Sequence, residues 1–213
     1  EYQIPESKIR VIHYGIPASP PSDSIRSQIS AITQNFPYIF WIGRMETRKN
    51  LELLITVFTQ IKPKYPDLKL VLAGKPGEGY AEIESLINQS AYKDDFCRLG
   101  FVSEAEKQAL YRQATLFVFP SWYEGFGFPI LEAMRAGTPV MAANTSSLPE
   151  VGGNAALYAD PNNPEEWTRE LSYLLDHEDT RQQLIKRGHE QIKQFSFETT
   201  VEQTIAFIMH EKE

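Results

Sequence analysis

Four charged side chains lie at spacings that could hold a charged ligand. In the stretch SWYEGFGFPILEAMRAGTPV, Glu124 and Glu132 lie on either side of a glycine–aromatic turn. In the stretch WIGRMETRKNLELL, Arg44 and Lys49 lie between an apolar run and a helical pattern. An arginine fork together with a lysine point charge suits a diphosphate. A carboxylate among apolar residues needs a partner, because an unpaired buried charge is costly.

The two cations flank the predicted start of a helix, where free N–H groups and the helix dipole favour anions. A plainer interpretation stays open, because charged loops are mostly solvated. The letters RMETRK could form a surface cluster in which Glu46 is the internal counterion. Composition alone favours that solvated cluster.

The two acids are predicted to lie on different elements. Phe128 precedes a proline and is kept out of the helical region, whereas Pro129 suits the first helical position. We therefore expect a helix to start near residue 129, with Glu132 in its first turn and Glu124 in the loop before it. The alternative that Glu132 merely caps its own helix while Glu124 is a solvated loop acid is equally supported.

Two glycine-rich stretches could let a ligand approach the backbone. Gly125 and Gly127 alternate with Phe126 and Phe128 between the two acids, and the glycines would expose backbone N–H groups. The stretch GKPGEG, residues 74–79, has neither the G-x-G-x-x-G order nor the lysine and hydroxyl residue that end a Walker loop. It is better interpreted as a plain turn.

No resident metal or cofactor is expected. The histidines at 13, 177, 189 and 210 lack metal-ligand spacing and cysteine partners, and no D-x-D occurs. Cys97, Trp41 and Phe117 fall on predicted strands and are interpreted as core residues. A diphosphate would then have to be neutralised by cations and helix ends.

The elements that must position these residues alternate between short apolar runs and longer helical patterns. Strands are predicted at 9–14, 38–42, 68–73, 95–99, 115–119, 139–142 and 155–158. Helices are predicted at 51–61, 80–90, 104–112 and 129–136, and in about three segments from Pro164 onwards, broken near Asp179 and Ser196. Asn50 and Ser103 are the expected N-caps and Gly137 is the expected helix stop.

This alternation predicts a single α/β domain over residues 1–213, built on a Rossmann-like, doubly wound parallel sheet with a helical carboxyl-terminal tail. Residues 18–24, ASPPSDS, are expected to form a surface loop. Ligands of such sheets bind beyond the carboxyl ends of the strands. The loops that begin at Gly43, Gly74 and Gly100, and the loop 120–128, are therefore the expected site.

Composition limits the classes of function. The 213 residues are 42% hydrophobic and 23% charged, typical of a soluble globular protein. The net charge of −7 argues against a general nucleic-acid or anionic-membrane binder. No apolar run approaches the roughly 20 residues of a membrane span, and no signal peptide pattern is present.

The single Cys97 fits a reducing compartment, so we expect a cytoplasmic protein. Because the first residue is Glu1, we expect the chain to be part of a longer protein.

The motifs together resemble a known family. GRMETRKN, followed by PSWYEGFGFPILEAMRAGTPV and SSLPEVGGNAALYADP, is similar to the carboxyl-terminal half of retaining glycosyltransferases of the GT-B fold. That family is marked by an E-x7-E motif, and Glu124 and Glu132 have its spacing. The resemblance extends from IPESKIRVIHYGI to the last helix. It implies two Rossmann-like domains facing a cleft, of which this chain holds the donor-binding one and lacks the amino-terminal acceptor domain.

The resemblance implies a role for each charged candidate. Arg44 and Lys49 would bind the donor diphosphate and stabilise the negative charge that grows on the departing nucleoside diphosphate. Glu124 would lie by the donor sugar and orient it, while Glu132 would accept hydrogen bonds from the ribose hydroxyls. Transfer would proceed with retention and without a metal. As an isolated domain the chain is expected to catalyse little or nothing.

The other implied contacts involve backbone groups and the nucleotide base. Phe126, Gly127 and Phe128 would offer N–H groups to sugar or phosphate, and Phe101 and Val102 would lie against the base, with Gly43 at the start of the first loop. The chain departs from the family at 14–17, where Tyr-Gly-Ile-Pro replaces Asn-Gly-Val/Ile-Asp. Any contact from that loop is therefore not carried over.

Three functions are compatible with these residues. The first is the donor-binding half of a glycosyltransferase that moves a hexose to a polysaccharide, oligosaccharide or glycolipid. SWYEGFGFPILEAM and SSLPEV look most like bacterial mannosyltransferases that use GDP-mannose, with a UDP-sugar as the alternative donor. The second is a non-catalytic nucleotide-binding or interaction module of the same fold. The third, another GT-B enzyme such as an epimerase, is disfavoured by the E-x7-E spacing.

Any membrane contact would be peripheral, at the inner face of the membrane.

Overall fold

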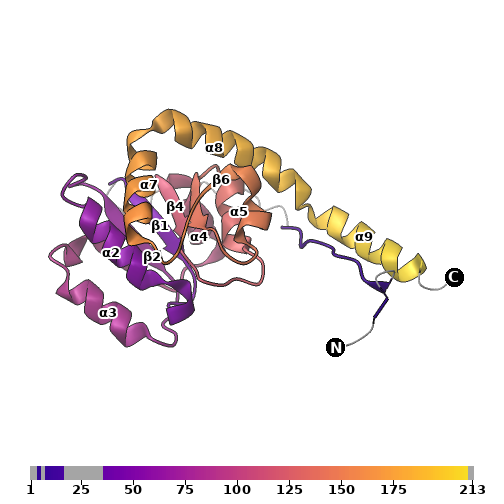
Figure 1. The fold of residues 1–213 in the computed structure, drawn as a ribbon, viewed down its shortest axis with the longest axis horizontal. Helices are drawn as coiled ribbons and strands as arrows, with labels where there is room; N and C mark the ends of the chain where they lie inside the picture. Colours follow the sequence, from indigo (N-terminus) through magenta and orange to yellow (C-terminus); the bar gives the residue numbers. More distant parts are fainter. Residues whose placement is uncertain (1–3, 6–7, 17–35, 211–213) are drawn as a thin grey trace.

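A six-stranded parallel sheet forms the centre of the computed structural model, which describes residues 4–5, 8–16 and 36–210 (Figure 1). Its strands are β1 (Tyr38–Ile42), β2 (Lys69–Ala73), β3 (Phe96–Gly100), β4 (Leu116–Phe119), β5 (Val140–Ala143) and β6 (Ala156–Ala159). They lie in the order β3-β2-β1-β4-β5-β6, with every neighbouring pair parallel. The chain therefore reverses its direction of travel across the sheet between β1 and β4, which is where doubly wound sheets open a crevice.

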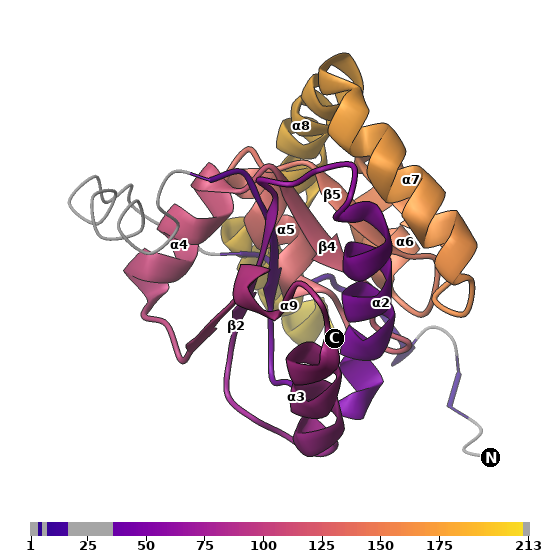
Figure 2. The ribbon, with the colours of Figure 1, turned by 90° about the vertical axis from the view of Figure 1, so that its left-hand side faces the viewer.

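Helices cover both faces of the sheet. The α-helices are α2 (Leu51–Ile61), α3 (Tyr80–Gln89), α4 (Glu104–Gln113), α5 (Phe128–Arg135), α6 (Leu148–Gly152), α7 (Pro164–Asp176), α8 (Glu178–Gln191) and α9 (Phe197–His210). The short 3-10 turns are η3 (Thr47–Lys49), η4 (Lys93–Asp95), η5 (Gly153–Ala155) and η6 (Ile192–Gln194). Figure 2 shows α4 and α5 on one side of the strands and α2 and α7 on the other, and α2 packs on α7 while α5 packs on α8.

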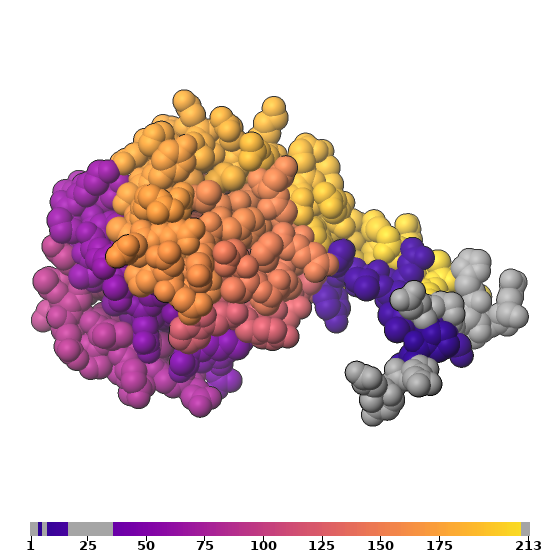
Figure 3. Space-filling view, in the orientation of Figure 1, coloured from indigo at the N-terminus to yellow at the C-terminus, as the bar shows by residue number. Residues whose placement is uncertain are grey.

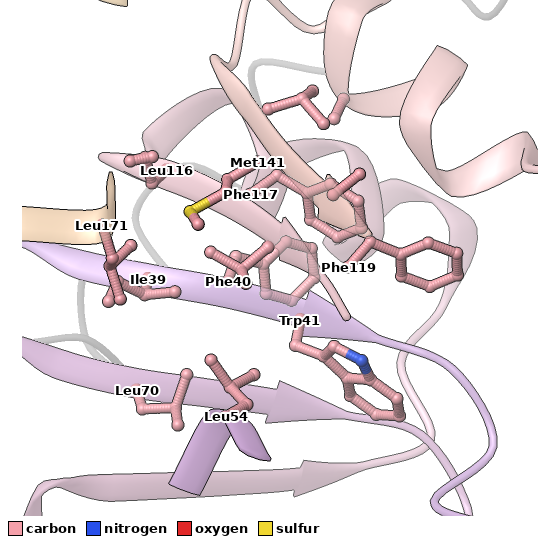
Figure 4. Close-up of a cluster of buried hydrophobic side chains, with 14 of the residues drawn as sticks. Ile39, Phe40, Trp41, Leu54, Leu70, Leu116, Phe117, Phe119, Met141 and Leu171 are labelled. Atoms are coloured by element: carbon pink, nitrogen blue, oxygen red, sulfur yellow. The ribbon is translucent and has the colours of Figure 1, made fainter. Parts of the chain in front are cut away.

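Apolar side chains on both faces of the strands stabilise this arrangement. Strands β4 and β5 are buried along their whole length, as their continuous apolar sequences predict. Figure 4 shows Phe40, Phe117 and Phe119 packed together across β1 and β4, with Trp41 at the end of β1. Trp41 and Phe117 are fully buried, so the prediction that they are core residues is confirmed. Burial of each large side chain contributes about 1.5–3 kcal/mol.

The predicted element boundaries are confirmed for all six strands of the sheet and for the predicted helices, to within one or two residues, whereas helix α6 was not predicted. Ser103 forms a capping box with Glu106: its hydroxyl accepts from the Glu106 N–H, and the Glu106 carboxylate accepts from the Ser103 N–H at 2.7 Å. Gly137 follows α5 with a φ of +75°, as expected of a helix stop. The prediction that the Asn50 side chain caps the next helix is wrong. Asn50 precedes α2, but its side chain does not cap the helix and donates instead to the Pro120 and Pro161 carbonyls.

The strand predicted at 9–14 is wrong. Residues 8–16 contain no strand, and only an isolated bridge joins Ile16 to Ser196. The segment runs along the start of α9 instead, away from the sheet (Figures 1 and 3). The Ile16 N–H donates to the Phe195 carbonyl at 3.0 Å, and the Thr200 hydroxyl donates to the His13 carbonyl. The predicted surface loop at 18–24 lies outside the described residues.

Candidate functional site

Glycines end the first three strands at one edge of the sheet. Gly43 and Gly74 follow β1 and β2, and Gly100 is the last residue of β3. A Cβ on Gly74 would lie 1.7 Å from the Gly43 carbonyl oxygen, and Gly74 has a φ of +138°. Only glycine therefore allows the ends of β1 and β2 to approach this closely. Beyond the glycines lies an open cavity of about 730 Å³.

The cavity is lined by residues from the loops after β1, β2 and β3. Its walls are formed by Ile42, Gly43, Arg44, Gly74, Lys75, Pro76, Phe101, Val102, Glu104 and Lys107. Four of the predicted site residues are among them, namely Gly43, Arg44, Phe101 and Val102. The Phe101 ring is 73% exposed, and the Lys75 ammonium lies 5.1 Å from its centroid. The cavity thus offers an aromatic face beside a group of cations.

Lys49 and Glu124 form an ion pair beside this cavity rather than in its wall. The Lys49 Nζ lies 2.6 Å from Glu124 Oε1 and 5.3 Å from the centroid of the Phe119 ring, and both charged side chains are about nine-tenths buried. Arg48 contacts the other oxygen, Glu124 Oε2, at 3.0 Å and also pairs with Glu46. The solvated-cluster alternative is therefore correct in giving Glu46 a counterion role, but Lys49 is not a solvated side chain.

The pKa of Arg48 reflects these neighbours. Burial acts to lower it, but the hydrogen bonds and charges of Glu124 and Glu46 outweigh burial and raise the pKa above its ordinary value. The guanidinium therefore brings a permanent positive charge to the loop that carries Glu124.

Two serines hold the loop that contains Glu124. The Ser146 hydroxyl accepts from the Glu124 N–H at 3.0 Å, and the Ser147 hydroxyl donates to the Glu124 carbonyl at 2.9 Å. The Ser147 hydroxyl also donates to the Phe126 carbonyl. The sequence motif SSLPEV pointed to this segment, but not to the bonds that Ser146 and Ser147 make with a loop more than twenty positions earlier.

Glu132 belongs to a separate network. Helix α5 begins at Phe128, so Glu132 lies at the start of the second turn, and its predicted placement in the first turn is wrong. Its carboxylate contacts the Lys107 ammonium at 2.6 Å and accepts from the Tyr111 hydroxyl at 3.1 Å. Glu132 therefore pairs with α4 and does not cap its own helix. Because Lys107 also lines the cavity, it connects Glu132 with the cavity wall.

The pKa values of the two ionisable partners of Glu132, Tyr111 and Lys107, are both raised. Burial raises the pKa of Tyr111 well above its ordinary value, and the charge of Glu132 adds to the shift. Burial acts to lower the pKa of Lys107, but hydrogen bonds and charges from Glu104 and Glu132 raise it. Lys107 thus keeps its positive charge, and the phenol of Tyr111 stays neutral.

The glycine–aromatic turn lies at the amino end of α5. Gly127 occupies the N-cap position with a φ of +132°, a conformation that favours glycine. The rings of Phe126 and Phe128 pack against each other and against Tyr14 from the amino-terminal segment. The structure thus places the backbone of this turn at a helix start and directs the Phe126 and Phe128 side chains towards other rings.

The sequence missed four residues of this region: Arg48, Lys75, Lys107 and Tyr111. None of the four has a motif spacing of its own. Arg48 and Lys75 meet partners from the loops that follow neighbouring strands, whereas Lys107 and Tyr111 reach Glu132 from helix α4. Within residues 4–5, 8–16 and 36–210, no group of three or more His, Cys, Asp or Glu side chains could hold a metal ion. None of the helices in those residues is long and apolar enough to span a bilayer.

Comparison with known proteins identifies relatives across most of the chain. Residues 23–191 match the family Glycosyl transferases group 1. The chain is 38% identical over 172 residues to the O-antigen chain mannosyltransferase B of Escherichia coli, which covers 79% of this chain and 44% of that protein. It is 31% identical over 169 residues to the serotype-specific mannosyltransferase WbdA of Escherichia coli, which covers 76% of this chain and 20% of that protein.

A solved structure shares the fold. The sucrose-phosphate synthase of Thermosynechococcus elongatus aligns with a TM-score of 0.81 and 25% identity, over 94% of this chain and 52% of that chain. The chain therefore spans about half, or less, of the length of these relatives.

Proposed function

Because the chain belongs to the family Glycosyl transferases group 1, we propose that it is the donor-binding part of a retaining hexosyltransferase with the GT-B architecture. The observation that carries this proposal is the cluster at the carboxyl edge of the sheet. There the cavity with Arg44 adjoins the Lys49–Glu124 pair, and Lys107 connects the cavity wall with Glu132. Cations at this edge suit the diphosphate of a nucleotide sugar.

In the proposed complex, Arg44 and Lys49 bind the diphosphate and stabilise the charge that develops on it as the sugar leaves. Glu124, held by Lys49 and Arg48, orients the donor sugar. Glu132 accepts hydrogen bonds from the ribose. These roles need no proton transfer between the two acids, which lie in different networks. Transfer proceeds with retention and with cations and helix ends, rather than a metal, neutralising the diphosphate.

In the proposed complex the nucleotide base lies on the exposed Phe101, next to Val102. The mannosyltransferase relatives support mannose as the transferred sugar, with GDP-mannose as the proposed donor and a UDP-sugar as the alternative.

The acceptor is proposed to be a polysaccharide, oligosaccharide or glycolipid, bound by a separate amino-terminal domain. The relatives are about twice the length of this chain or longer, which supports a second domain in the working enzyme. The runner-up is a non-catalytic nucleotide-binding module with the same fold. It would bind nucleotide but support no sugar transfer in the full-length protein.

Nucleotide binding tests the proposal. We expect calorimetry to detect binding of GDP or UDP by the 213-residue chain, and Arg44→Ala and Lys49→Ala each to cost about 1.5–3 kcal/mol, the range for a hydrogen bond to a charged group. Arg98→Ala is the matched control, because Arg98 pairs with Glu84 at the surface outside the cavity. Equal binding by the wild type and both site variants would rule out the diphosphate assignment.

A further inference from the structure

Arg48 lies between the predicted phosphate ligands Arg44 and Lys49, and it makes more contacts to the neighbouring loop than either of them. Its Nη1 donates to the Tyr123 carbonyl at 2.6 Å and to Glu124 Oε2 at 3.0 Å. Its Nη2 donates to Glu46 Oε1 at 2.7 Å. Its own carbonyl accepts from the Trp122 N–H at 3.1 Å. Arg48 therefore joins the loop after β1 to the loop after β4.

Glu124 has a different cation at each carboxylate oxygen. Lys49 contacts Oε1 at 2.6 Å and Arg48 contacts Oε2 at 3.0 Å. A carboxylate that is held at one oxygen can still turn about its last side-chain bond, whereas one held at both oxygens cannot. With only 11% of its side chain exposed, Glu124 also has little access to water that could replace either cation.

The two cations differ in how they can hold this position. Lysine is a point charge on a flexible stem, whereas the guanidinium is a planar fork whose two nitrogens keep a fixed separation. Here one nitrogen serves Glu124 and the Tyr123 carbonyl while the other serves Glu46. A lysine at position 48 would have one nitrogen for these separate acceptors. The Arg48 side chain is 42% exposed, and Glu124 keeps Lys49 when Arg48 is removed, so we expect variants at 48 to fold.

We propose that Arg48 is a positioning residue that fixes the orientation of the Glu124 carboxylate toward the donor sugar, without contacting the diphosphate itself. The proposal rests on the proposed function, in which Glu124 orients that sugar. Without Arg48, the carboxylate turns toward Lys49 alone, and its free oxygen no longer points in one direction. The sugar-dependent part of donor affinity is then lost, whereas affinity for the nucleoside diphosphate is kept.

The test compares a nucleotide with its sugar conjugate. Calorimetry would give the Kd of GDP and GDP-mannose, and of UDP and UDP-glucose, for the wild type, Arg48→Gln and Arg48→Lys. We expect the Kd of the diphosphate to stay within about twofold, while the extra affinity given by the sugar falls about tenfold, the size of one hydrogen bond to a charged group. Arg48→Lys should behave like Arg48→Gln, because the fork rather than the charge is required. Arg169→Gln, at an exposed arginine that pairs with Glu170, is the matched control.

Each other outcome has a defined meaning. Equal losses of affinity for GDP and GDP-mannose in Arg48→Gln would show that Arg48 contacts the diphosphate, and the inference would be wrong while the proposed function survives. Unchanged affinities in both variants, full rescue by Arg48→Lys, or a wild type in which the sugar adds no affinity would also overturn the inference. A wild type that binds none of the four compounds would reject the proposed function itself, and the inference with it.

Discussion

At the scale of single residues, the pair of Lys107 and Glu132 shows how one side chain can serve both folding and a site. Lys107 contacts Glu132 at 2.6 Å and Glu104 at 2.8 Å, and it also lines the cavity. Lys107 and Glu132 are each 18% exposed, whereas Glu104 is 63% exposed. The two ion pairs of one lysine should therefore contribute very differently to stability.

We expect Lys107→Met to lower the free energy of unfolding by about 1–3 kcal/mol, because Glu132 loses the ammonium that lies 2.6 Å from its carboxylate and keeps the Tyr111 hydroxyl. Glu104→Gln should cost no more than about 1 kcal/mol, as is usual for an exposed ion pair. Urea denaturation of the two variants beside the wild type would measure the difference. Equal costs would contradict the inference that Glu132 depends on Lys107.

The sequence could identify the charged residues of the site, but not their partners. Arg44 and Lys49 were recognisable because they precede a helix, and Glu124 and Glu132 because a glycine turn and a proline separate them. Their assignment to one site also required the family resemblance. Arg48, by contrast, meets Glu124 only because β1 and β4 are neighbours in the sheet. Such a contact depends on strand order, which no local pattern contains.

At the scale of elements, the close approach of β1 and β2 depends on Gly74. We expect Gly74→Ala to destabilise the fold by at least about 2 kcal/mol, because a Cβ would collide with the Gly43 carbonyl and because its φ of +138° strains other residues. It should also weaken nucleotide binding, since Gly43 and Gly74 both line the cavity.

Gly125 is the matched control, because it tests whether any glycine-to-alanine change in these loops destabilises the protein. A Cβ on Gly125 would meet nothing within 4 Å, so Gly125→Ala should change the free energy of unfolding by no more than about 0.5 kcal/mol. Thermal or urea denaturation would give both values. A Gly74→Ala protein as stable as Gly125→Ala would show that the strand ends can separate without cost.

Element prediction succeeded where burial on two faces left a continuous apolar run, as in β4 and β5. It failed at residues 9–14, whose apolar residues resemble a strand but remain outside the sheet. Ile9 and Val11 are 57% and 76% exposed, and the segment bonds to Phe195 and Thr200 through Ile16 and His13 rather than to a strand. A short apolar run alone therefore does not show whether the segment pairs with the sheet.

At the scale of the whole molecule, buried phenols couple folding to alkaline pH. Burial raises the pKa of Tyr158 to about 12, and burial raises the pKa values of Tyr38 and Tyr111 as well. A tyrosine in the unfolded chain titrates near about pH 10. Above that pH the unfolded state loses protons that the folded state retains, so the free energy of unfolding falls as the pH rises. The stability that each protonated phenol contributes is lost once the pH exceeds the pKa of that phenol in the folded protein.

We expect Tyr158→Phe to flatten part of this alkaline decline. The substitution should cost little near pH 8, because the Tyr158 hydroxyl makes only a 3.4 Å contact with the Leu148 carbonyl. Urea midpoints measured between pH 8 and the alkaline limit of folding would give the slope. Tyr173→Phe, at an exposed ring, is the matched control. A slope as steep in Tyr158→Phe as in the wild type would exclude Tyr158 as a contributor.

The contact between residues 8–16 and the start of α9 has a consequence for the order of folding. Thr200 and His13 are joined by a hydrogen bond although they are 187 residues apart in sequence. A contact of this span closes a very large loop, and its entropic cost can be recovered only after the intervening sheet has brought Phe195 into place. We therefore expect the two segments to dock late as the chain folds, and the same contact to open early when the molecule fluctuates.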